Sequence, residues 1–170
     1  MKVAALTSSE FAAAVPRLGE ILADAVMSGA GVSFMQPFSA EDGARFWQAQ
    51  SEAVASGVKT VFAAREGEII AGTVILEKAW PPNQPHRGDI SKMLVHRDFR
   101  RRGVGKLLVN ALLTKARARG LTLITFDTAS GSPAEAFYSS LGFTAVGRIP
   151  GYALSPTGKL DDTTIFYMKL

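Results

Sequence analysis

The most regular hydrophobic pattern in the chain begins at residue 104. Apolar side chains recur there at the spacing of one helical face, at Val104, Leu107, Leu108, Ala111 and Leu112. This spacing predicts an amphipathic helix, because residues three or four positions apart lie on the same side. Arg117, Arg119 and Gly120 follow. A cationic last turn closed by a glycine is typical of a helix end.

Two apolar runs flank this predicted helix. The run from Ile90 to Val95 is too short for a helix and is followed by charged residues, so we predict a buried strand. Leu121 to Asp127 is apolar and β-branched, and it predicts a second buried strand. Two neighbouring strands joined by a helical crossover run parallel. The centre of the chain is therefore predicted to be a strand, a helix and a parallel strand.

The remaining pattern adds elements on both sides of this unit. We predict strands over Val3–Leu6, Lys59–Ala64, Glu68–Lys78, Phe143–Ile149 and Thr163–Lys169, and helices over residues 9–27, 39–57 and a short stretch from Ser132. Capping sequences support these helix starts, at Thr7–Glu10, Ser39–Asp42 and Ser132–Glu135. Pro16 should kink the first helix or restart it. Residues 150–162 are predicted to be a loop. The fold class is α/β, with a mixed sheet in a single domain over residues 1–170.

Residues 28–39 contain glycines and Pro37 and are predicted to be a loop. Phe34, Met35 and Phe38 make this loop more apolar than a simple connection requires. These three side chains either complete the hydrophobic core or form the wall of a substrate pocket.

Composition narrows the class of protein. Hydrophobic residues make up 47% of the 170 residues and charged residues 20%, which is typical of a packed domain and not of a disordered chain. The absence of cysteine excludes disulfides, thiolate nucleophiles and cysteine metal sites, and two histidines are too few for a metal cluster. No apolar stretch approaches the roughly 18 residues of a membrane span. We expect a soluble cytoplasmic protein without a metal.

The loop between the central strand and helix combines glycines with basic side chains. It reads Arg100-Arg101-Arg102-Gly103-Val104-Gly105-Lys106, and it holds much of the excess charge in a chain of net charge +4. Free N–H groups at a helix start bind anions, and glycines let an anion approach the backbone. The loop suits a diphosphate, although it lacks the Gly-Lys-Ser/Thr ending of triphosphate loops and the third glycine of dinucleotide loops. The alternative is a solvated basic turn before an ordinary helix.

Three sequence elements occur in a recognisable order. They are the strand Ile90–Val95, the loop pattern Arg100-x-x-Gly103-x-Gly105, and the pattern Ala134-x-x-x-Tyr138-x-x-x-Gly142-Phe143. Together they resemble the GNAT superfamily of acetyl-CoA-dependent N-acetyltransferases. Within it, residues 123–138 and 146–154 are similar to the tabtoxin-resistance acetyltransferase and its relatives. The resemblance implies the GNAT fold, with a central mixed sheet of about six to seven strands flanked by helices.

The resemblance also implies a binding site for acetyl-CoA as co-substrate. The central strand is expected to splay from the strand ending at Asp127, so that its backbone pairs with pantetheine as another strand would. One N–H near Leu94 or Val95 would face the thioester carbonyl and stabilise negative charge there. The implied cofactor-binding residues are Met93, Leu94, Val95, Arg100, Arg101, Arg102, Gly103, Val104, Gly105, Lys106 and Ser132.

Catalytic roles are implied for Asp89, Asp127 and Tyr138. Asp89 stands where glutamate is expected in the tabtoxin-resistance relative, and Gly131 stands where many superfamily members have asparagine. We expect the two aspartates not to touch, one binding the cationic amine and the other accepting its proton, while the Tyr138 hydroxyl protonates the leaving thiolate. The alternatives are a turn cap for Asp127, a solvated strand edge for Asp89 and a half-buried core position for Tyr138.

We therefore expect an acetyl-CoA-dependent N-acetyltransferase acting on a small-molecule amine, such as an amino-acid-like toxin or antibiotic, with antibiotic resistance as one role. It is expected to be a monomer or homodimer without a nucleic-acid or membrane partner. The alternatives are acetylation of a protein N-terminus or lysine, and a noncatalytic CoA-sensing or RNA-binding module. RNA binding predicts aromatic side chains among the arginines, yet only Phe99 lies near them.

Overall fold

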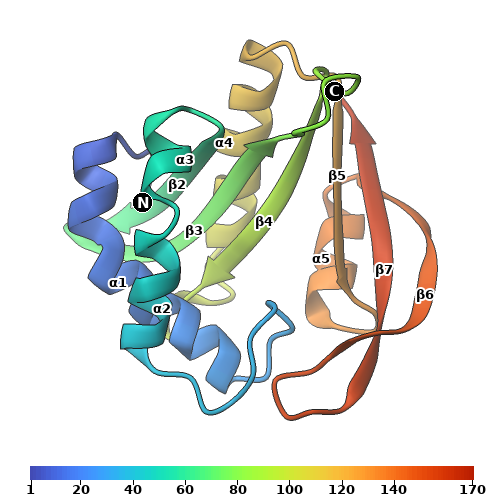
Figure 1. Ribbon diagram of the computed structural model, residues 1–170, viewed down its shortest axis with the longest axis horizontal. Coiled ribbons are helices and arrows are strands. Elements are labelled where there is room, and N and C mark those ends of the chain that lie inside the picture. Colours follow the sequence, from blue (N-terminus) through green and yellow to red (C-terminus); the bar gives the residue numbers. More distant parts are fainter.

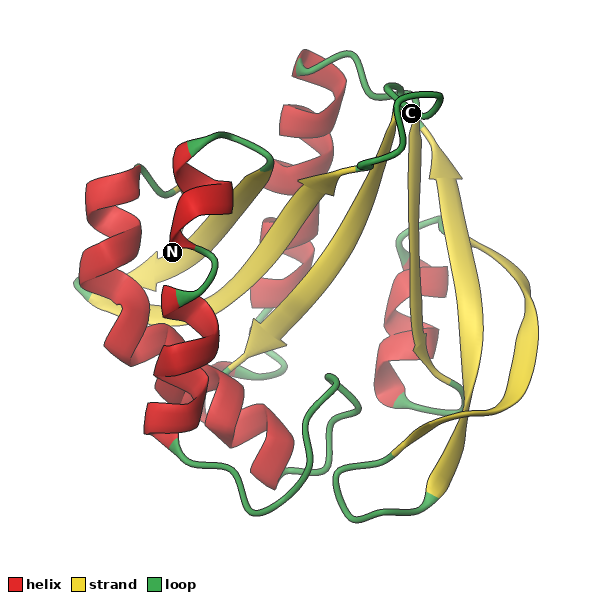
Figure 2. Ribbon diagram, viewed as in Figure 1, coloured by secondary structure: helices red, strands yellow, loops and turns green.

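The computed structural model describes all residues, 1–170, and contains one seven-stranded sheet with helices on both faces (Figures 1 and 2). The strands are β1 (Lys2–Ala5), β2 (Lys59–Glu66), β3 (Ile69–Lys78), β4 (Arg87–Val95), β5 (Leu123–Ala129), β6 (Thr144–Leu154) and β7 (Leu160–Lys169). The helices are α1 (Ser8–Met27), α2 (Ala40–Gln48), α3 (Ser51–Ala55), α4 (Val104–Ala118) and α5 (Pro133–Ser140), with a short 3-10 turn, η1 (Arg97–Phe99). No helix combines the length and the apolar run that crossing a membrane requires.

The sheet is mixed, in the order β1-β2-β3-β4-β5-β7-β6. Only the β4–β5 pair is parallel, and α4 is the crossover between these two strands. Every other neighbouring pair is antiparallel. The predicted α/β class, the strand number and the parallel central unit are therefore confirmed.

The parallel pairing of β4 and β5 is short. The register joins Arg87 to Leu123, Gly88 to Ile124 and Asp89 to Thr125, and then stops. Beyond Asp89 the two strands diverge, and Figure 1 shows the ribbons of β4 and β5 separating toward the carboxyl end of β4. The expected splay of the central strand is present, and it leaves one edge of β4 without a neighbouring strand.

Each face of the sheet carries its own hydrophobic core. Helices α4 and α5 cover one face, where Leu108 and Leu112 of α4 pack with Ile124 and Phe126 of β5. Helices α1, α2 and α3 cover the other face, around the fully buried Trp47. Side chains alternate along a strand. Because Ile124 and Phe126 face α4, Thr125 and Asp127 lie on the opposite face of the sheet, the face that α1 covers.

The helix caps form largely as the sequence predicts. Thr7 and Glu10 make a reciprocal capping box at α1, and Ser39 and Asp42 make another at α2. Helix α1 runs through Pro16 as a single element.

The predicted capping box at Ser132 is only half present. The Ser132 hydroxyl accepts from the Glu135 N–H at 3.4 Å, but the Glu135 carboxylate accepts from Gly131 N instead of returning to Ser132. Its second oxygen accepts from Thr164 Oγ1 at 2.7 Å, so this carboxylate joins α5 to β7. These hydrogen bonds lower the pKa of Glu135.

The predicted helix over residues 39–57 is wrong in one respect, because it divides into α2 and α3. The side chains of Gln50 and Ser51 donate to the carbonyls of Phe46 and Gln48, at 3.1 and 2.7 Å. The carbonyls in the last turn of a helix have no partner within the helix, and here these two side chains supply one. The chain therefore turns after α2.

The predicted loop over residues 150–162 is also wrong. Strand β6 continues to Leu154, and β7 already begins at Leu160. The register of β6 on β7 shifts between Ile149 and Ala153, so Pro150 lies in an irregular stretch of an edge strand, where a missing N–H is tolerated.

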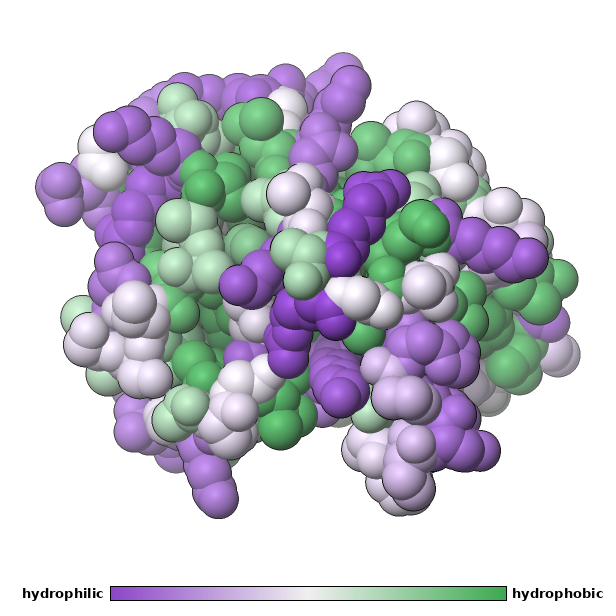
Figure 3. Space-filling model, turned by 90° about the horizontal axis from the view of Figure 1, so that it is seen from above, coloured by the Kyte–Doolittle hydropathy of each residue, from purple (hydrophilic) through white to green (hydrophobic).

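Figure 3 shows the end of the sheet opposite the splay, seen from above, with hydrophilic and hydrophobic residues interspersed. Trp80, in the loop before β4, is the most exposed large hydrophobic residue of the chain, at 88%.

Helices α1 and α2 pack backbone against backbone at two glycines. A Cβ on Gly43 would lie 2.4 Å from the carbonyl oxygen of Gly19, and a Cβ on Gly19 would lie 2.6 Å from that of Ala40. Neither position has room for a methyl group. This contact fixes the position of α2, which carries Phe46 toward the splayed side of β4.

We predict that Gly43→Ala lowers the free energy of unfolding by about 2–3 kcal/mol, because the added methyl group forces the two helix backbones apart. The exposed control Gln48→Ala on the same helix should change it by about 0.5 kcal/mol or less. Urea denaturation measures the free energy of unfolding of both variants. Equal values would show that the α1–α2 contact accommodates the methyl group without loss of stability.

Candidate active site

The loop before α4 leaves the start of the helix without a capping side chain. Gly103 is the N-cap of α4, has φ of 78° and supplies no side-chain cap, so the first N–H groups of the helix have no capping acceptor. The left-handed backbone explains the glycine, since a Cβ at this residue would meet no other atom but would be strained. Arg101 and Lys106 are exposed and make no ion pair within the chain. A diphosphate fits this combination of free N–H groups and two uncompensated cations.

Two of the predicted loop cations are bound within the protein. Arg100 donates to the Val95 carbonyl at 3.0 Å and to Asp24 Oδ2 at 2.9 Å. Arg102 donates to Glu66 Oε1 at 2.5 Å, and its guanidinium lies 5.2 Å from the centre of the Phe99 ring. Both residues therefore shape the loop, in addition to any contact they make with a ligand.

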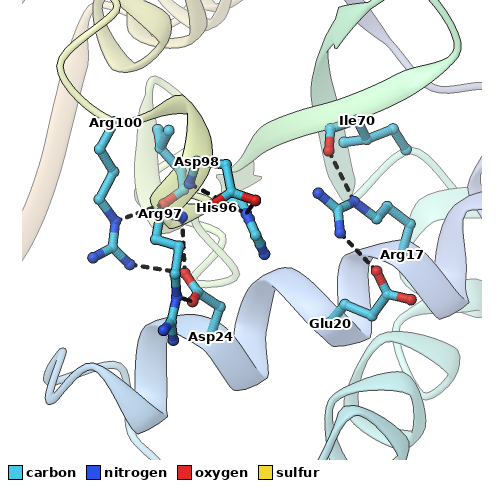
Figure 4. A network of polar contacts seen from close by, with 9 residues as sticks. Arg17, Glu20, Asp24, Ile70, His96, Arg97, Asp98 and Arg100 are labelled. Carbon is cyan, nitrogen blue, oxygen red and sulfur yellow. Dashed lines mark hydrogen bonds and ion pairs between the residues drawn. The ribbon is translucent and has the colours of Figure 1, made fainter.

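Asp24 is the residue of this region that the sequence reading missed. It lies near the end of α1, only 7% exposed, and faces the β4–α4 connection (Figure 4). Its carboxylate accepts from the Arg97 N–H at 3.0 Å, from the Arg97 guanidinium and from Arg100 Nη2 at 2.9 Å. The available signal was a lone acid on the apolar face of α1, between Leu22 and Val26.

Gly105 has a packing role that the sequence did not predict. A Cβ at this position would lie 3.1 Å from Phe137 Cζ and 3.7 Å from Met93 Sδ. The glycine therefore lets α4 approach α5 and β4 closely. Val104 is buried in the core beneath the loop.

The free edge of β4 lies directly before this loop. His96 N donates to Ala71 of β3, and the alternation of an antiparallel pair then directs the Val95 backbone to the opposite edge. Arg100 occupies the Val95 carbonyl there. Leu94 is buried and in register with Thr73, so its side chain faces the α1 core. Met93 is partly buried on the α4 face.

Asp89 belongs to a polar cluster at the last paired position of β4 and β5. Its carboxylate accepts from the Arg87 guanidinium and from Thr125 Oγ1, and Arg87 also donates to Thr125 Oγ1 at 2.6 Å. The carboxylate is thus neutralised by an arginine and held by a hydroxyl of the neighbouring strand.

Asp127 lies two residues farther along β5, on the same face as Thr125. It is exposed, and Oδ2 accepts from Thr163 Oγ1 at 2.7 Å. No hydrogen bond joins Asp127 to Asp89. The two carboxylates therefore lie on neighbouring strands at the point where the sheet opens, and Asp127 makes no ion pair.

Tyr138 is mostly inside the protein, at 5% exposure. Its ring packs against Phe126 and Phe143 with ring centres 4.2 and 5.8 Å apart. Burial raises the pKa of Tyr138, so its hydroxyl keeps its proton at neutral pH. The ring of Tyr138 is therefore part of the core, as the alternative interpretation predicted, and this packing does not decide the role of its hydroxyl.

A surface hollow of about 580 Å³ lies elsewhere, between α1 and the turn of the β2–β3 hairpin. Its lining includes Arg17, Arg65 and His96, and it contains none of Asp89, Asp127 and Tyr138.

Comparison with known proteins agrees with this geometry. The family model described as "Acetyltransferase (GNAT) family" matches residues 23–143. The chain belongs to the GNAT acetyltransferase family. It is an N-acetyltransferase with the expected GNAT fold, and the family resemblance read from the sequence is confirmed.

Solved structures of the family have the same fold. The chain is similar to a ribosomal-protein-alanine N-acetyltransferase from Brucella melitensis, with 20% identity, full coverage of both chains and a TM-score of 0.81. It is similar to a putative acetyltransferase from Salmonella typhimurium solved with acetyl-CoA, with 19% identity, coverage of 100% of this chain and 94% of that one, and a TM-score of 0.81. An N-acetyltransferase from Staphylococcus aureus is 14% identical, with coverage of 99% and 97% and a TM-score of 0.79.

We predict that Asp24→Asn lowers the free energy of unfolding by about 1–2 kcal/mol, because it removes the charge that pairs with two arginines. This expected loss is smaller than the ~3–5 kcal/mol that removing one partner of a fully buried ion pair costs, since the side chains of Arg97 and Arg100 are 58% and 41% exposed.

The matched control is Glu20→Gln, one turn earlier on α1, which removes the exposed ion pair with Arg17 (Figure 4). It should change stability by about 0.5 kcal/mol or less. Urea denaturation measures the free energy of unfolding of both variants. Equal losses would mean that the Asp24 cluster contributes no more to stability than a surface ion pair.

Proposed function

We propose that the protein transfers an acetyl group from acetyl-CoA to the amine of a small molecule. The observation that carries this proposal is the free edge of β4, which begins beyond Asp89 and leads to the uncapped start of α4. An extended ligand with a phosphate end suits both features at once. The family match and the Salmonella structure containing acetyl-CoA support the same ligand.

The residues fit acetyl-CoA as follows. The N–H groups at the start of α4, with Arg101 and Lys106, would hold the diphosphate, and the β4 edge near Met93 and Val95 would hold the pantetheine. When bound, acetyl-CoA supplies an activated acetyl group as a thioester. Ser132 would lie at the far side of the opening, at the start of α5.

Asp127 is the better candidate for the base that takes the proton of the acceptor amine. It is exposed and accepts one side-chain hydrogen bond, from Thr163, whereas the Asp89 carboxylate is paired with Arg87 and also accepts from Thr125. A carboxylate without an ion pair is free to bind an ammonium group and to accept its proton. Asp89 would orient Thr125 and the end of the paired region.

Tyr138 is the candidate proton donor. Because burial raises its pKa, the hydroxyl remains protonated over the range in which the enzyme must work. Its ring is fixed by Phe126 and Phe143, so the hydroxyl has a defined position.

Enclosure of the opening favours a small acceptor over a protein segment. Gln36 N donates to the Pro156 carbonyl at 2.9 Å, so the loop before α2 meets the loop between β6 and β7. Phe34 and Phe38 lie on this loop, 4.7 Å apart, and pack partly on the α1 core. They thus contribute to the core and also border the acceptor side. The resemblance to tabtoxin-resistance enzymes makes amino-acid-like toxins and antibiotics the first acceptors to test.

The similarity to the Brucella ribosomal-protein-alanine N-acetyltransferase supports a second candidate, acetylation of a protein N-terminus. The test is release of free thiol from acetyl-CoA across a panel of amino acids, aminoglycosides, polyamines and N-terminal alanine peptides. Saturable release with a small amine supports the proposal. Release with the peptides alone would favour the second candidate, and release with neither would overturn both.

We predict that Asp127→Asn lowers kcat/KM by about 10²–10⁴-fold at pH 7 and recovers partly at higher pH. An alkylammonium with a pKa near 10.4 is neutral in only about one part in 2,500 at pH 7, so the loss of a base is felt most there. The matched control Asp161→Asn removes a carboxylate of β7 that makes no hydrogen bond or ion pair and should retain the wild-type profile. Wild-type rates for Asp127→Asn from pH 6 to 9 would contradict the assignment.

We predict a smaller effect for Tyr138→Phe, about tenfold in kcat with little change in the KM for acetyl-CoA. A thiol with a pKa near 8.5 leaves tolerably well as the anion, so it does not depend on a proton donor as strongly as an amine depends on a base. Stopped-flow measurement of thiol release compares the two variants. Full activity of Tyr138→Phe would make the hydroxyl a structural group. A larger loss than in Asp127→Asn would mean that protonation of the leaving thiolate limits the rate more than deprotonation of the amine.

A further inference from the structure

Lys92 is a cation on the acceptor side of β4 that the predicted site did not include. The register of β3 on β4 pairs Thr73 with Leu94 and Ile75 with Ser91, so Lys92 and Met93 lie opposite the single residue Val74. Lys92 itself has φ of 49°, which is unusual for a residue with a side chain. Bulges of this kind redirect a side chain. The irregularity turns Lys92 toward the α1–α2 side of the sheet.

The Lys92 ammonium lies against two aromatic rings that are in contact with each other. Its Nζ is 5.5 Å from the centre of the Phe34 ring, in the loop after α1, and 5.4 Å from the centre of the Phe46 ring, on α2. The two rings touch each other edge to face, with centres 5.3 Å apart. Both distances are within the range of cation–π contact.

No carboxylate and no carbonyl of the chain accepts a hydrogen bond from Lys92 Nζ. Lys59, on the neighbouring part of the same face, differs in this respect, because its Nζ bonds Gln50 Oε1 at 2.7 Å and Glu77 Oε2 at 3.3 Å. An ammonium carries three donors, and aromatic faces accept none of them as an oxygen would. The environment of Lys92 thus attracts a cation without satisfying its donors.

The electrostatics of this position agree with an unpaired cation. Burial lowers the pKa of Lys92, the charge of Lys59 adds to the decrease, and Asp127 opposes it. Asp127 acts from β5, across the opening between the two central strands. The opening is therefore bordered by one anionic and one cationic side chain that face the same space.

We propose that Lys92, held against the Phe34 and Phe46 rings, forms a carboxylate subsite for the acceptor, so that the enzyme takes molecules carrying both an amine and a carboxylate. The acceptor amine lies toward Asp127 and its carboxylate accepts from Lys92 Nζ. The cation–π contacts hold the ammonium in place before the acceptor arrives. This inference rests on the proposed acetyltransferase function and specifies its substrate class.

The test compares the twenty L-amino acids with their carboxamides, which keep the amine and lose the negative charge. For those acids that react, wild-type kcat/KM should exceed that of the amide by about ten- to a hundredfold, the effect of one hydrogen bond between charged groups. Lys92→Met keeps the apolar stem and should remove this preference through the KM for the acid. Its KM for acetyl-CoA should stay within about twofold of wild type, which also reports a folded protein.

The control is Lys78→Met, an exposed lysine of β3, which should leave the preference for acids unchanged. A wild-type enzyme that acetylates amides as well as acids would overturn the subsite, and so would a Lys92→Met variant that loses both activities equally.

A binding measurement separates this inference from the proposed function. Saturation-transfer NMR detects the free amino acids and their amides on the protein with CoA present, without any turnover. Binding of acids that depends on Lys92, in the absence of acetylation of any amine, would support the subsite and contradict the acetyl-transfer proposal. Acetylation of acids and amides at equal rates would support acetyl transfer and contradict the carboxylate subsite. If acids neither bind nor react, the subsite is overturned.

Discussion

The parallel contact between β4 and β5 ends after Asp89 and Thr125, and the rest of the site depends on that ending. Beyond it, the edge of β4 that faces β5 has no neighbouring strand, although backbone N–H and C=O groups require partners. In most sheets such an edge is at the outside of the molecule. Here it lies in the middle of a seven-stranded sheet, between two layers of helices, so the backbone groups of β4 would bind an extended ligand in a fixed direction.

Electrostatics determine which cations remain for a ligand. Asp24 and Glu66 bind Arg97, Arg100 and Arg102, and these pairs join the loop before α4 to α1 and to the β2–β3 hairpin. Arg101 and Lys106 keep uncompensated charge beside the helix start. A loop built only of free cations would be repelled by its own charge, whereas a partly neutralised loop is held in shape and still attracts an anion.

Local signals predicted most of the fold. The periodic helix from Val104, the capping boxes at Thr7 and Ser39 and the strand pattern all depend on residues within a few positions of one another. The errors have a different origin. Strand β6 continues through Pro150 because its partner β7 accommodates a register shift, and Asp24 meets Arg97 across 73 positions of sequence. The direction of Lys92 follows from a bulge whose pairing involves β3. In each case the partner is distant in the sequence, and a local pattern does not identify it.

Acetyl-CoA is expected to bind along the free edge of β4 and at the start of α4. Amide hydrogen exchange followed by NMR, with and without acetyl-CoA, tests it most directly. The N–H groups of Met93 and Val95 and those of the first turn of α4 should gain protection, while those of β1 and β6 should not. Protection confined to the hollow between α1 and the β2–β3 hairpin, with β4 unchanged, would contradict the claim.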